Sequence, residues 1–185
     1  MIITIGGTAG SGKTSVAFAI AKKLGYTYFG AGEIRRRYAL DHGMTLEQLN
    51  ELSESDPKSD HFADECMRTL AEREDNLVVD GRVAFFFIPK SIKVFIDATL
   101  DIRAARVMKD CRVEEKISCL ADAKASLDKR QVSDEKRYKT LYGINAFDMS
   151  NYDLVIDSTN KVIDEVAGEI YRFVMFKSNC INKKE

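Results

Sequence analysis

The sequence predicts an α/β protein in which a parallel sheet of about five strands lies between two layers of helices. Short runs rich in β-branched residues alternate with segments whose apolar residues recur at helical spacing. The first run, Met1–Ile5, is followed by a helical segment at Lys13–Leu24 and a second run at Tyr26–Phe29, which is the order of a βαβ unit. The chain has 185 residues, of which 45% are hydrophobic, so it suits one compact domain with a full core.

Three further apolar runs complete the predicted sheet. They are Leu77–Asp80, Ile92–Ile96 and Leu154–Ile156. No strand pattern occurs over residues 33–74, so this stretch is expected to form a helical insert beside the sheet. Its helices are expected at Glu33–Asp41, Thr45–Leu52 and His61–Glu72, the second opened by a capping box of Thr45 and Gln48. Later helices are expected at Asp101–Lys109 and Val162–Phe176.

The segment Asp110–Tyr142 is dense in charge and poor in large aliphatic residues. Such a segment is typical of a solvated helical hairpin, and equally of a mobile lid over a site. Its length does not distinguish the two interpretations.

A glycine-rich motif lies between the first strand and the first helix. Its residues fit the pattern Gly-x-x-x-x-Gly-Lys-[Ser/Thr]: Gly7, Thr8, Ala9, Gly10, Ser11, Gly12, Lys13 and Thr14. Glycines let backbone amides approach an anion closely, and the helix N-terminus adds unpaired N–H donors. Lys13 would bring a charge to the β- and γ-phosphates of ATP, and the Thr14 hydroxyl would bind Mg²⁺. A turn that only joins strand to helix would not need Lys13 and Thr14, so the motif predicts a P-loop that binds ATP, with Ser15 beside it.

A carboxylate follows the third predicted strand. Leu77–Val79 is apolar and ends in Asp80, which places this side chain at the carboxyl edge of the sheet, where ligands bind in open α/β folds. Asp80 is therefore expected to help Thr14 to hold the Mg²⁺ ion.

Phosphoryl transfer between two anions requires cations beyond Lys13, and arginine grips phosphate oxygens with a planar fork. The candidates are Arg35–Arg37, Arg82, Arg103, Arg106, Arg112, Arg130 and Arg137. A lone surface arginine is usually only a solvated charge. Arg82 differs because it follows Asp80 and Gly81 at the same edge of the sheet.

Several blocks resemble the nucleoside monophosphate kinases, and most closely the cytidylate kinases of the short archaeal type. After the P-loop comes Gly30-Ala31-Gly32-Glu33-Ile34-Arg35-Arg36, which is similar to the family's Ser-Ala-Gly-Asp/Glu-Ile-Phe-Arg. The other blocks are Gly43–Asn50, Val79–Arg82, Ser133–Tyr138, Tyr142–Ile144 and Tyr152–Asp157. The resemblance covers nearly the whole chain, and its Ala-Gly-Glu-Ile and Glu-Lys-Arg-Tyr blocks are more specific than the P-loop.

The resemblance implies a single P-loop kinase domain with a three-layer α/β/α core. The core would comprise residues 1–32, 73–109 and 143–185, with a nucleotide-acceptor insert at about 33–72 and a lid at about 110–142. Arg36 and Arg82 match the arginines that hold the acceptor's phosphate, with Gly32 beside them. Arg106 matches an arginine that packs on the ATP base.

The same resemblance assigns catalytic roles to Lys13 and to two lid arginines, Arg130 and Arg137. The spacing of seven between these arginines places both on one face of a helix. The alternative for this pair is a solvated charged helix. Three positions depart from the family pattern: Gly30 replaces Ser, Arg35 replaces an aromatic residue, and Asp110 stands where related kinases place a lid arginine.

The resemblance implies that the chain transfers the γ-phosphoryl group of Mg·ATP to a nucleoside monophosphate, with CMP or dCMP favoured. The alternatives are a kinase for another small acceptor, such as another nucleoside monophosphate or a metabolite hydroxyl, and a slow nucleotide-binding switch. His42 and His61 each stand alone in polar helical stretches, so surface histidines are expected there rather than catalytic acids.

Composition limits the classes of partner and compartment. Lys+Arg 28 and Asp+Glu 29 nearly cancel to a net charge of −1, which argues against a dedicated nucleic-acid or membrane-surface protein. No apolar run approaches the roughly 20 residues that span a bilayer, and the four cysteines lack zinc-site spacing. We therefore expect a cytoplasmic protein without nucleic acid or membrane partners. Together with the P-loop, the resemblance implies Mg²⁺ as the cofactor and ATP and a nucleoside monophosphate as the substrates, and we expect a monomer.

Overall fold

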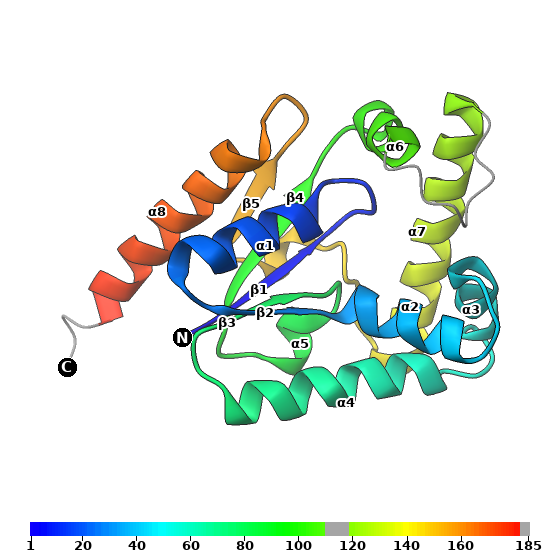
Figure 1. Cartoon of the computed structure of the whole chain (residues 1–185), viewed down its shortest axis with the longest axis horizontal. Helices are drawn as coiled ribbons and strands as arrows, with labels where there is room; N and C mark the ends of the chain where they lie inside the picture. The colour runs from blue at the N-terminus through cyan, green and yellow to red at the C-terminus, as the bar shows by residue number, and fades with distance from the viewer. Residues whose placement is uncertain (110–118, 182–185) are drawn as a thin grey trace.

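The computed structural model describes residues 1–109 and 119–181, and it contains one parallel sheet (Figure 1). Its strands are β1 (Ile2–Gly7), β2 (Thr27–Gly30), β3 (Leu77–Asp80), β4 (Ile92–Asp97) and β5 (Leu154–Asp157). They lie in the order β2-β3-β1-β4-β5, and every neighbouring pair is parallel. The expected α/β class and the five-stranded parallel sheet are confirmed.

Helices cover both faces of the sheet (Figure 1). Helices α1 (Lys13–Leu24) and α8 (Ile163–Ile181) pack on one face, and α4 (Lys58–Arg73) and α5 (Ala84–Phe87) lie on the other. Between β2 and α4 come α2 (Ala31–Asp41) and α3 (Leu46–Leu52). Helices α6 (Leu100–Lys109) and α7 (Leu120–Tyr142) pack against each other beyond the strand ends, and a short 3₁₀ helix occupies Met149–Asn151.

The main core lies between the sheet and the pair α1 and α8. Ile3, Ile5 and Val94 of the central strands are fully buried there, next to Ile20 of α1 and Ile170 of α8. Because the central strands are covered on both faces, they read in the sequence as continuous apolar runs rather than alternating ones. This pattern is the reason that the strands could be predicted from local sequence.

Strand order fixes where a ligand can bind. The chain leaves β1 toward β2 and β3 on one side and toward β4 and β5 on the other, so β1 is the switch point of the sheet. Gly7, Asp80 and Asp97 end the three central strands at the same edge. Because β1 and β3 are neighbours, the P-loop and the Asp80–Arg82 turn lie together at this edge and line one cavity.

Some elements differ in length from the sequence expectation. Helix α4 begins at Lys58 instead of His61, directly after Pro57, and α8 continues beyond Phe176 to Ile181. The part of Asp110–Tyr142 that the structure describes is one continuous helix from Leu120, while Asp110 and Arg112 lie outside the described residues.

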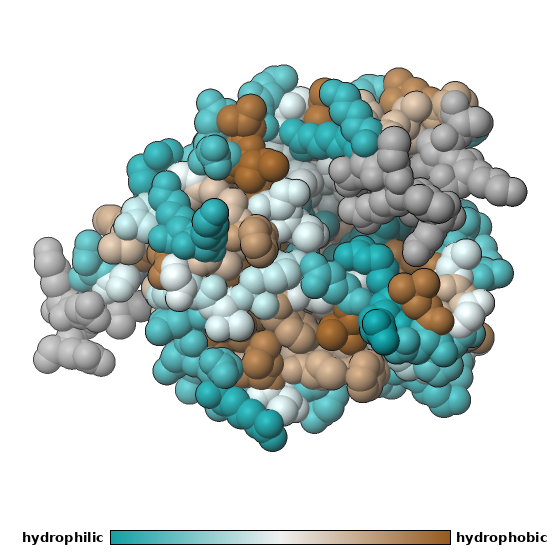
Figure 2. All heavy atoms as spheres, viewed as in Figure 1, coloured by the Kyte–Doolittle hydropathy of each residue, from teal (hydrophilic) through white to brown (hydrophobic). Residues whose placement is uncertain are grey.

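The surface is mixed, with hydrophilic side chains and smaller apolar patches on the face shown in Figure 2. Within residues 1–109 and 119–181, no helix combines the length and the apolar character that crossing a membrane requires. The aromatic run Phe85–Phe87 lies in α5; Phe85 is buried against Tyr152, and Phe86 is exposed.

Candidate active site

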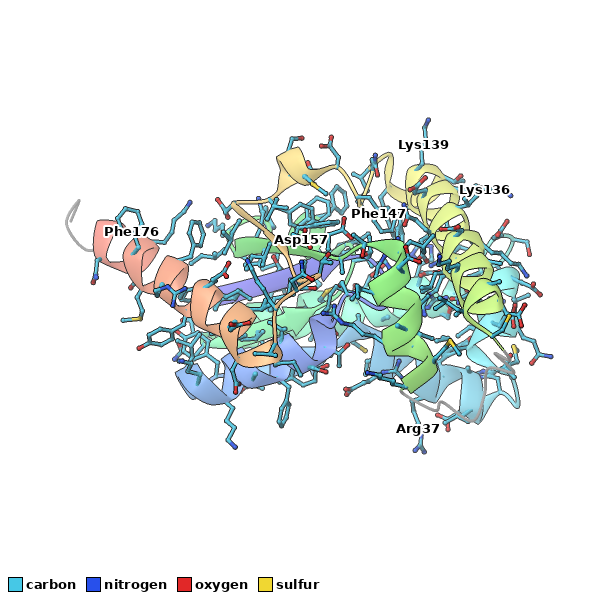
Figure 3. All side chains as sticks on the ribbon, turned by 90° about the horizontal axis from the view of Figure 1, so that it is seen from above. Arg37, Lys136, Lys139, Phe147, Asp157 and Phe176 are labelled. Carbon is cyan, nitrogen blue, oxygen red and sulfur yellow. The ribbon has the colours of Figure 1, made fainter. Side chains whose placement is uncertain are left out.

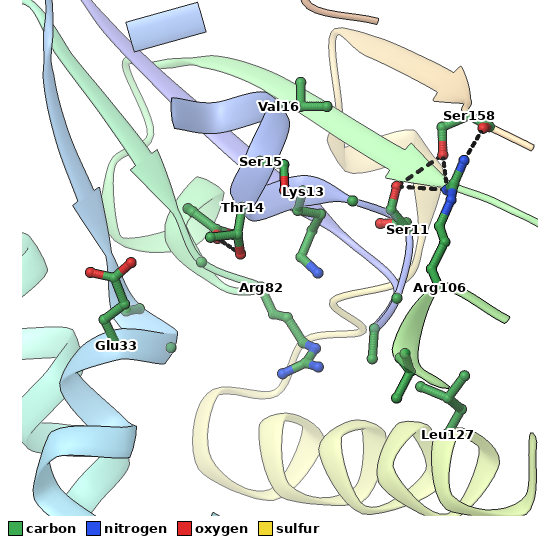
Figure 4. Close-up of a pocket in the computed structure, with 18 of the residues that line it drawn as sticks. Ser11, Lys13, Thr14, Ser15, Val16, Glu33, Arg82, Arg106, Leu127 and Ser158 are labelled. Carbon is green, nitrogen blue, oxygen red and sulfur yellow. Dashed lines mark hydrogen bonds between the residues drawn. The ribbon is translucent and has the colours of Figure 1, made fainter. Parts of the chain in front are cut away.

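A cavity of about 520 Å³ opens at the carboxyl edge of the sheet. Its walls come from the P-loop, the start of α2, the turn after β3, helices α6 and α7, and the segment after β5. Figure 4 shows Lys13 and Arg82 extending toward the space between the P-loop and α7. The P-loop residues and Asp80–Arg82, which are far apart in the sequence, therefore share one cavity.

The P-loop backbone adopts conformations that only glycine accepts easily. Gly7 has a φ of 135°, and a Cβ atom there would lie 2.0 Å from the carbonyl oxygen of Ile96 in β4. Gly12, with a φ of 89°, is the residue directly before helix α1, and no side chain there caps the helix N-terminus. The first amide groups of α1 therefore remain open toward the cavity, as an anion site at a helix N-terminus requires.

Lys13 lies within the loop that it is expected to serve. Its Nζ atom donates a hydrogen bond to the carbonyl oxygen of Thr8 at 2.9 Å. Burial lowers the pKa of Lys13 to about 7; the charges of Arg82 and Arg130 also lower it, while Asp80 and Asp134 oppose this effect. A phosphate beside this amino group would favour its charged form.

Thr14 and Asp80 lie together, as the sequence indicates for a metal site. The Thr14 hydroxyl donates to the Asp80 carboxylate, with 2.6 Å between Oγ1 and Oδ2. Hydroxyl and carboxylate oxygens are hard ligands of the kind that Mg²⁺ accepts. Over the described ranges, no group of three or more His, Cys, Asp or Glu residues could hold a metal alone. The donor set therefore fits an ion that also takes water and phosphate oxygens as ligands.

Arg82 is paired with a carboxylate of helix α7. Its Nε atom lies 3.0 Å from Oδ2 of Asp134, and both side chains are largely buried. Burial alone would raise the pKa of Asp134, but the charges of Arg82 and Arg137 hold it below its ordinary value. The pair fixes the Arg82 side chain at the cavity wall, next to Lys13 and Arg130.

Arg106 is held by backbone and side-chain oxygens on the opposite wall (Figure 4). Its Nη1 atom donates to the carbonyl oxygen of Ser11 at 3.2 Å and to the hydroxyl of Ser158 at 3.0 Å. Its Nη2 atom donates to the Ser158 carbonyl oxygen at 2.7 Å. These bonds hold the guanidinium group against the P-loop, and the residue lines the cavity.

The wall contributed by β2 and α2 contains Arg36, Gly32, Glu33 and Tyr28. The Tyr28 hydroxyl donates to the Glu33 carboxylate at 3.2 Å. Gly30 leaves room for this ring, because a Cβ atom there would lie 2.5 Å from the Tyr28 hydroxyl oxygen. Glycine thus replaces the family's serine at position 30 at the point where the Tyr28 ring lies against the backbone.

The structure brings together most of the predicted site residues, but not all of them. Gly10, Ser11, Gly12, Ser15 and Ala9 line the cavity with the residues described above, whereas Gly7 and Thr8 do not line it. The Thr8 hydroxyl instead donates to the Asp97 carboxylate at 2.7 Å. Arg137 does not line the cavity. Its side chain is 1% exposed and lies against Asp134 and Asp60, with distances of 2.6 Å and 3.1 Å.

Sequence reasoning did not assign roles to Asp134 or Ser158, which hold Arg82 and Arg106. Asp134 belongs to a block that carries the family resemblance, so its position could have been noted, but a carboxylate in a charged helix gives no signal of its own. Ser158 follows the last strand at the ligand-binding edge, which was its only signal.

Comparison with known proteins agrees with this geometry. The model of the cytidylate kinase-like family matches residues 2–160. The cytidylate kinase of Methanocella arvoryzae is 36% identical over 174 residues, which cover 94% of this chain and 97% of that protein. The cytidylate kinase of Archaeoglobus fulgidus is 33% identical over 185 residues, the whole length of both chains.

Solved structures show the same fold at lower identity. The shikimate kinase of Aquifex aeolicus superimposes with a TM-score of 0.63 at 20% identity and covers 96% of this chain and 98% of that one. An uncharacterised protein of Eubacterium ventriosum gives a TM-score of 0.69, also at 20% identity, over 94% of this chain and 98% of that one. The three-layer fold of P-loop kinases is thus found here, and by its sequence the chain belongs to the cytidylate kinase-like family.

Proposed function

We propose that the protein transfers the γ-phosphoryl group of Mg·ATP to CMP or dCMP and releases ADP with CDP or dCDP. The observation that carries this proposal is one shared cavity, which the P-loop and Lys13 line together with Arg36 and Arg82. One set of groups suits a triphosphate and the other suits a second phosphate. Family membership supports cytidylate as the acceptor.

In this mechanism the P-loop amides and Lys13 hold the β- and γ-phosphates of ATP, while Arg36 and Arg82 hold the acceptor's phosphate. Gly32 lets the acceptor approach the start of α2. An acceptor phosphate oxygen attacks the γ-phosphorus in line with its bond to the oxygen that bridges it to the β-phosphate; this bond breaks and ADP leaves. No general base is required because the attacking oxygen is ionised at neutral pH. Catalysis then consists of positioning and of charge neutralisation, in which Lys13 and Arg130 act on the transferring group.

The residues suited to Mg²⁺ are Thr14 and Asp80, whose oxygen atoms lie side by side. A bound Mg²⁺ ion would neutralise phosphate charge and orient the β- and γ-phosphates. Arg106, held against Ser11 and Ser158, is assigned to the wall that receives the ATP base. Arg137 is assigned to holding Asp134, and thereby Arg82, rather than to direct contact with the transferring group.

The proposal includes a division of the chain into a core, an acceptor insert at residues 33–72 and a lid at residues 110–142. It also includes a monomer in the cytoplasm that needs no nucleic acid or membrane partner. A lid that closes over both nucleotides would exclude water, which would otherwise accept the phosphoryl group.

An ADP-release assay with Mg·ATP tests the reaction against CMP, dCMP, UMP, AMP, GMP and shikimate. We expect turnover on CMP or dCMP to exceed that on the others by about tenfold or more, because the site would hydrogen-bond one base selectively. Equally feeble rates on every acceptor would refute the proposal and favour a nucleotide-binding switch. Preferred turnover on shikimate would move the chain to the metabolite kinases.

Two variants test the residue assignments within the same assay. Lys13→Ala is expected to abolish transfer while the unfolding transition is retained, because its charge is needed at the phosphates. Arg82→Ala is expected to raise the KM for CMP more than the KM for ATP. Unchanged acceptor kinetics in Arg82→Ala would show that this arginine does not hold the acceptor.

A further inference from the structure

Buried charged side chains form a continuous chain beside the cavity. Nη1 of Arg35 lies 3.6 Å from Oδ1 of Asp60, whose Oδ2 lies 3.1 Å from Nε of Arg137. Nη2 of Arg137 lies 2.6 Å from Oδ1 of Asp134, and Oδ2 of Asp134 lies 3.0 Å from Nε of Arg82. We call these five residues the buried charge chain. All of their side chains are at least 88% buried.

The buried charge chain joins parts of the protein that are far apart in the sequence. Arg35 comes from α2 and Asp60 from the first turn of α4, whereas Asp134 and Arg137 are one turn apart on α7. Arg82, which follows β3, forms one end of the buried charge chain, and Arg35 forms the other end. Both residues line the cavity. The two ends of the chain of contacts therefore both reach the proposed acceptor site.

Arg35 is the member of this chain that departs from the family pattern, where an aromatic residue is expected. Its side chain is 9% exposed, and its Nη2 atom donates to the Ser53 hydroxyl at 3.0 Å. Ser53 in turn bonds to Ser59, which lies next to Asp60 in the first turn of α4. An aromatic ring at position 35 would leave Asp60 with Arg137 as its only arginine within the buried charge chain.

A buried carboxylate takes up a fixed position only if the charges and donors around it determine one. Asp60 lies between two arginines, so the position of its carboxylate depends on both. Without Arg35, the Asp60 carboxylate would lose one of its two arginines and could shift. Arg137 could then shift too, because one of its two carboxylate partners would no longer be held in place. The effect would reach Arg82 through the two oxygens of Asp134.

From these contacts we propose that Arg35 is a positioning residue for the acceptor: through Asp60 it holds Arg137 and Asp134 so that Arg82 presents its guanidinium group to the acceptor's phosphate. This inference rests on the proposed function for its substrate. It concerns the acceptor and not ATP, because the P-loop lies outside the buried charge chain.

The test compares Arg35→Phe, which restores the aromatic residue of the family pattern, with Arg35→Lys, which keeps the charge. We expect Arg35→Phe to raise the KM for CMP by about tenfold or more, as when one partner of a buried charge pair is removed. We expect the KM for ATP and kcat to stay within about twofold, because Arg35 acts only through groups on the acceptor side. Arg35→Lys should recover part of the affinity for CMP.

Arg37→Ala is the matched control on the same helix. Arg37 is 78% exposed in its side chain, pairs with Asp41 one turn along α2, and points away from the body of the protein (Figure 3). Its removal should leave all constants unchanged. A folded Arg35→Phe protein with the wild-type KM for CMP would overturn the proposal, and so would an equal rise in the KM for both nucleotides.

A second measurement requires no substrate and separates this inference from the proposed function. Urea unfolding of Arg35→Phe, Arg137→Met and the double variant forms a cycle between two positions that are linked through Asp60. We expect the two destabilisations to be clearly non-additive in the double variant, because only there does the buried Asp60 carboxylate lose both of its arginines. Strict additivity would overturn the inference even if the enzyme phosphorylates CMP, and coupling without any nucleotide turnover would refute only the function. If Arg35→Phe does not fold, Arg35→Gln takes its place in both experiments.

Discussion

Asp64 of helix α4 provides a prediction about stability that does not depend on any ligand. The side chain is buried, and its carboxylate accepts a hydrogen bond from the Tyr142 hydroxyl at the end of α7. Burial raises the pKa of Asp64 to about 6; the Tyr142 bond opposes this rise, and the neighbouring charge of Asp60 adds to it. Asp64 therefore binds its proton more tightly in the folded protein than in the unfolded chain, where its pKa is near 3.8.

The sign of the effect follows from proton binding. When the folded state holds a proton that the unfolded state releases, the free energy of unfolding falls as pH rises between the two pKa values. The contribution of Asp64 is therefore present at about pH 4 and lost above about pH 6. The difference between the two pKa values corresponds to a full contribution of about 3 kcal/mol to the free energy of unfolding. About 2 kcal/mol of this is lost between pH 4.5 and pH 8.

Asp64→Asn isolates this contribution, because the amide oxygen can still accept the Tyr142 bond and the side chain does not titrate. Urea unfolding of both proteins at pH 4.5 and pH 8 gives the measurement. The stability of Asp64→Asn relative to the wild type should increase by about 2 kcal/mol from the lower to the higher pH. The exposed Asp128→Asn on α7 is the control and should show no such trend.

Tyr142→Phe tests the geometry from the other side. The lost hydroxyl stabilises the ionised carboxylate, so this variant should be destabilised more at pH 8 than at pH 4.5, by about 1.5–3 kcal/mol for a hydrogen bond to a charged group. Parallel curves of unfolding free energy against pH for the wild type and Asp64→Asn would refute the reasoning, since they would mean that Asp64 titrates at an ordinary pKa in the folded protein.

Three further predictions concern the elements around the site. Thr45→Ala removes the hydroxyl that caps α3, at 3.2 Å from its backbone amide partner, and should lower the unfolding free energy by about 1 kcal/mol in urea. Gly7→Ala places a methyl group against the Ile96 carbonyl oxygen, so calorimetry should show both a lower Tm and weaker ADP binding. The Lys136 amino group of α7 lies 2.8 Å from the carboxylate of Glu54, in the turn after α3, and so joins α7 to the proposed acceptor insert. Glu54→Lys should therefore raise the KM for CMP at low salt, and adding Lys136→Glu should restore it.

The fold and the phosphate site could be predicted because each rests on a local signal. A buried parallel strand is a short apolar run, and the P-loop is a fixed spacing between such a run and a helix. Asp80 could be placed because it ends one of these runs, and the structure brings its carboxylate to the Thr14 hydroxyl. In each case neighbours in the sequence determine the structure.

The buried charge chain could not be predicted in this way. Arg35 was one of three consecutive arginines considered as phosphate-binding candidates, and only its departure from the family pattern distinguished it. Its partner Asp60 is 25 residues away, in a helix that begins at Lys58 and was expected to begin three residues later, at His61. Which charges pair inside a protein depends on how helices meet, and no periodicity within one helix records that.

Helix α7 shows why the spacing of Arg130 and Arg137 predicted the same face but not the same surroundings. Seven residues return a side chain to nearly the same direction, yet they also move it about 10 Å along the axis. Over that distance the neighbour of α7 changes: Arg130 and Leu127 line the cavity, whereas Arg137 meets Asp60 of α4. The charge content of this helix indicated solvent exposure, but Asp134 and Arg137 are among its most buried residues because each neutralises the other. A charged helix that crosses a second element can therefore line a cavity at one turn and belong to the core two turns later.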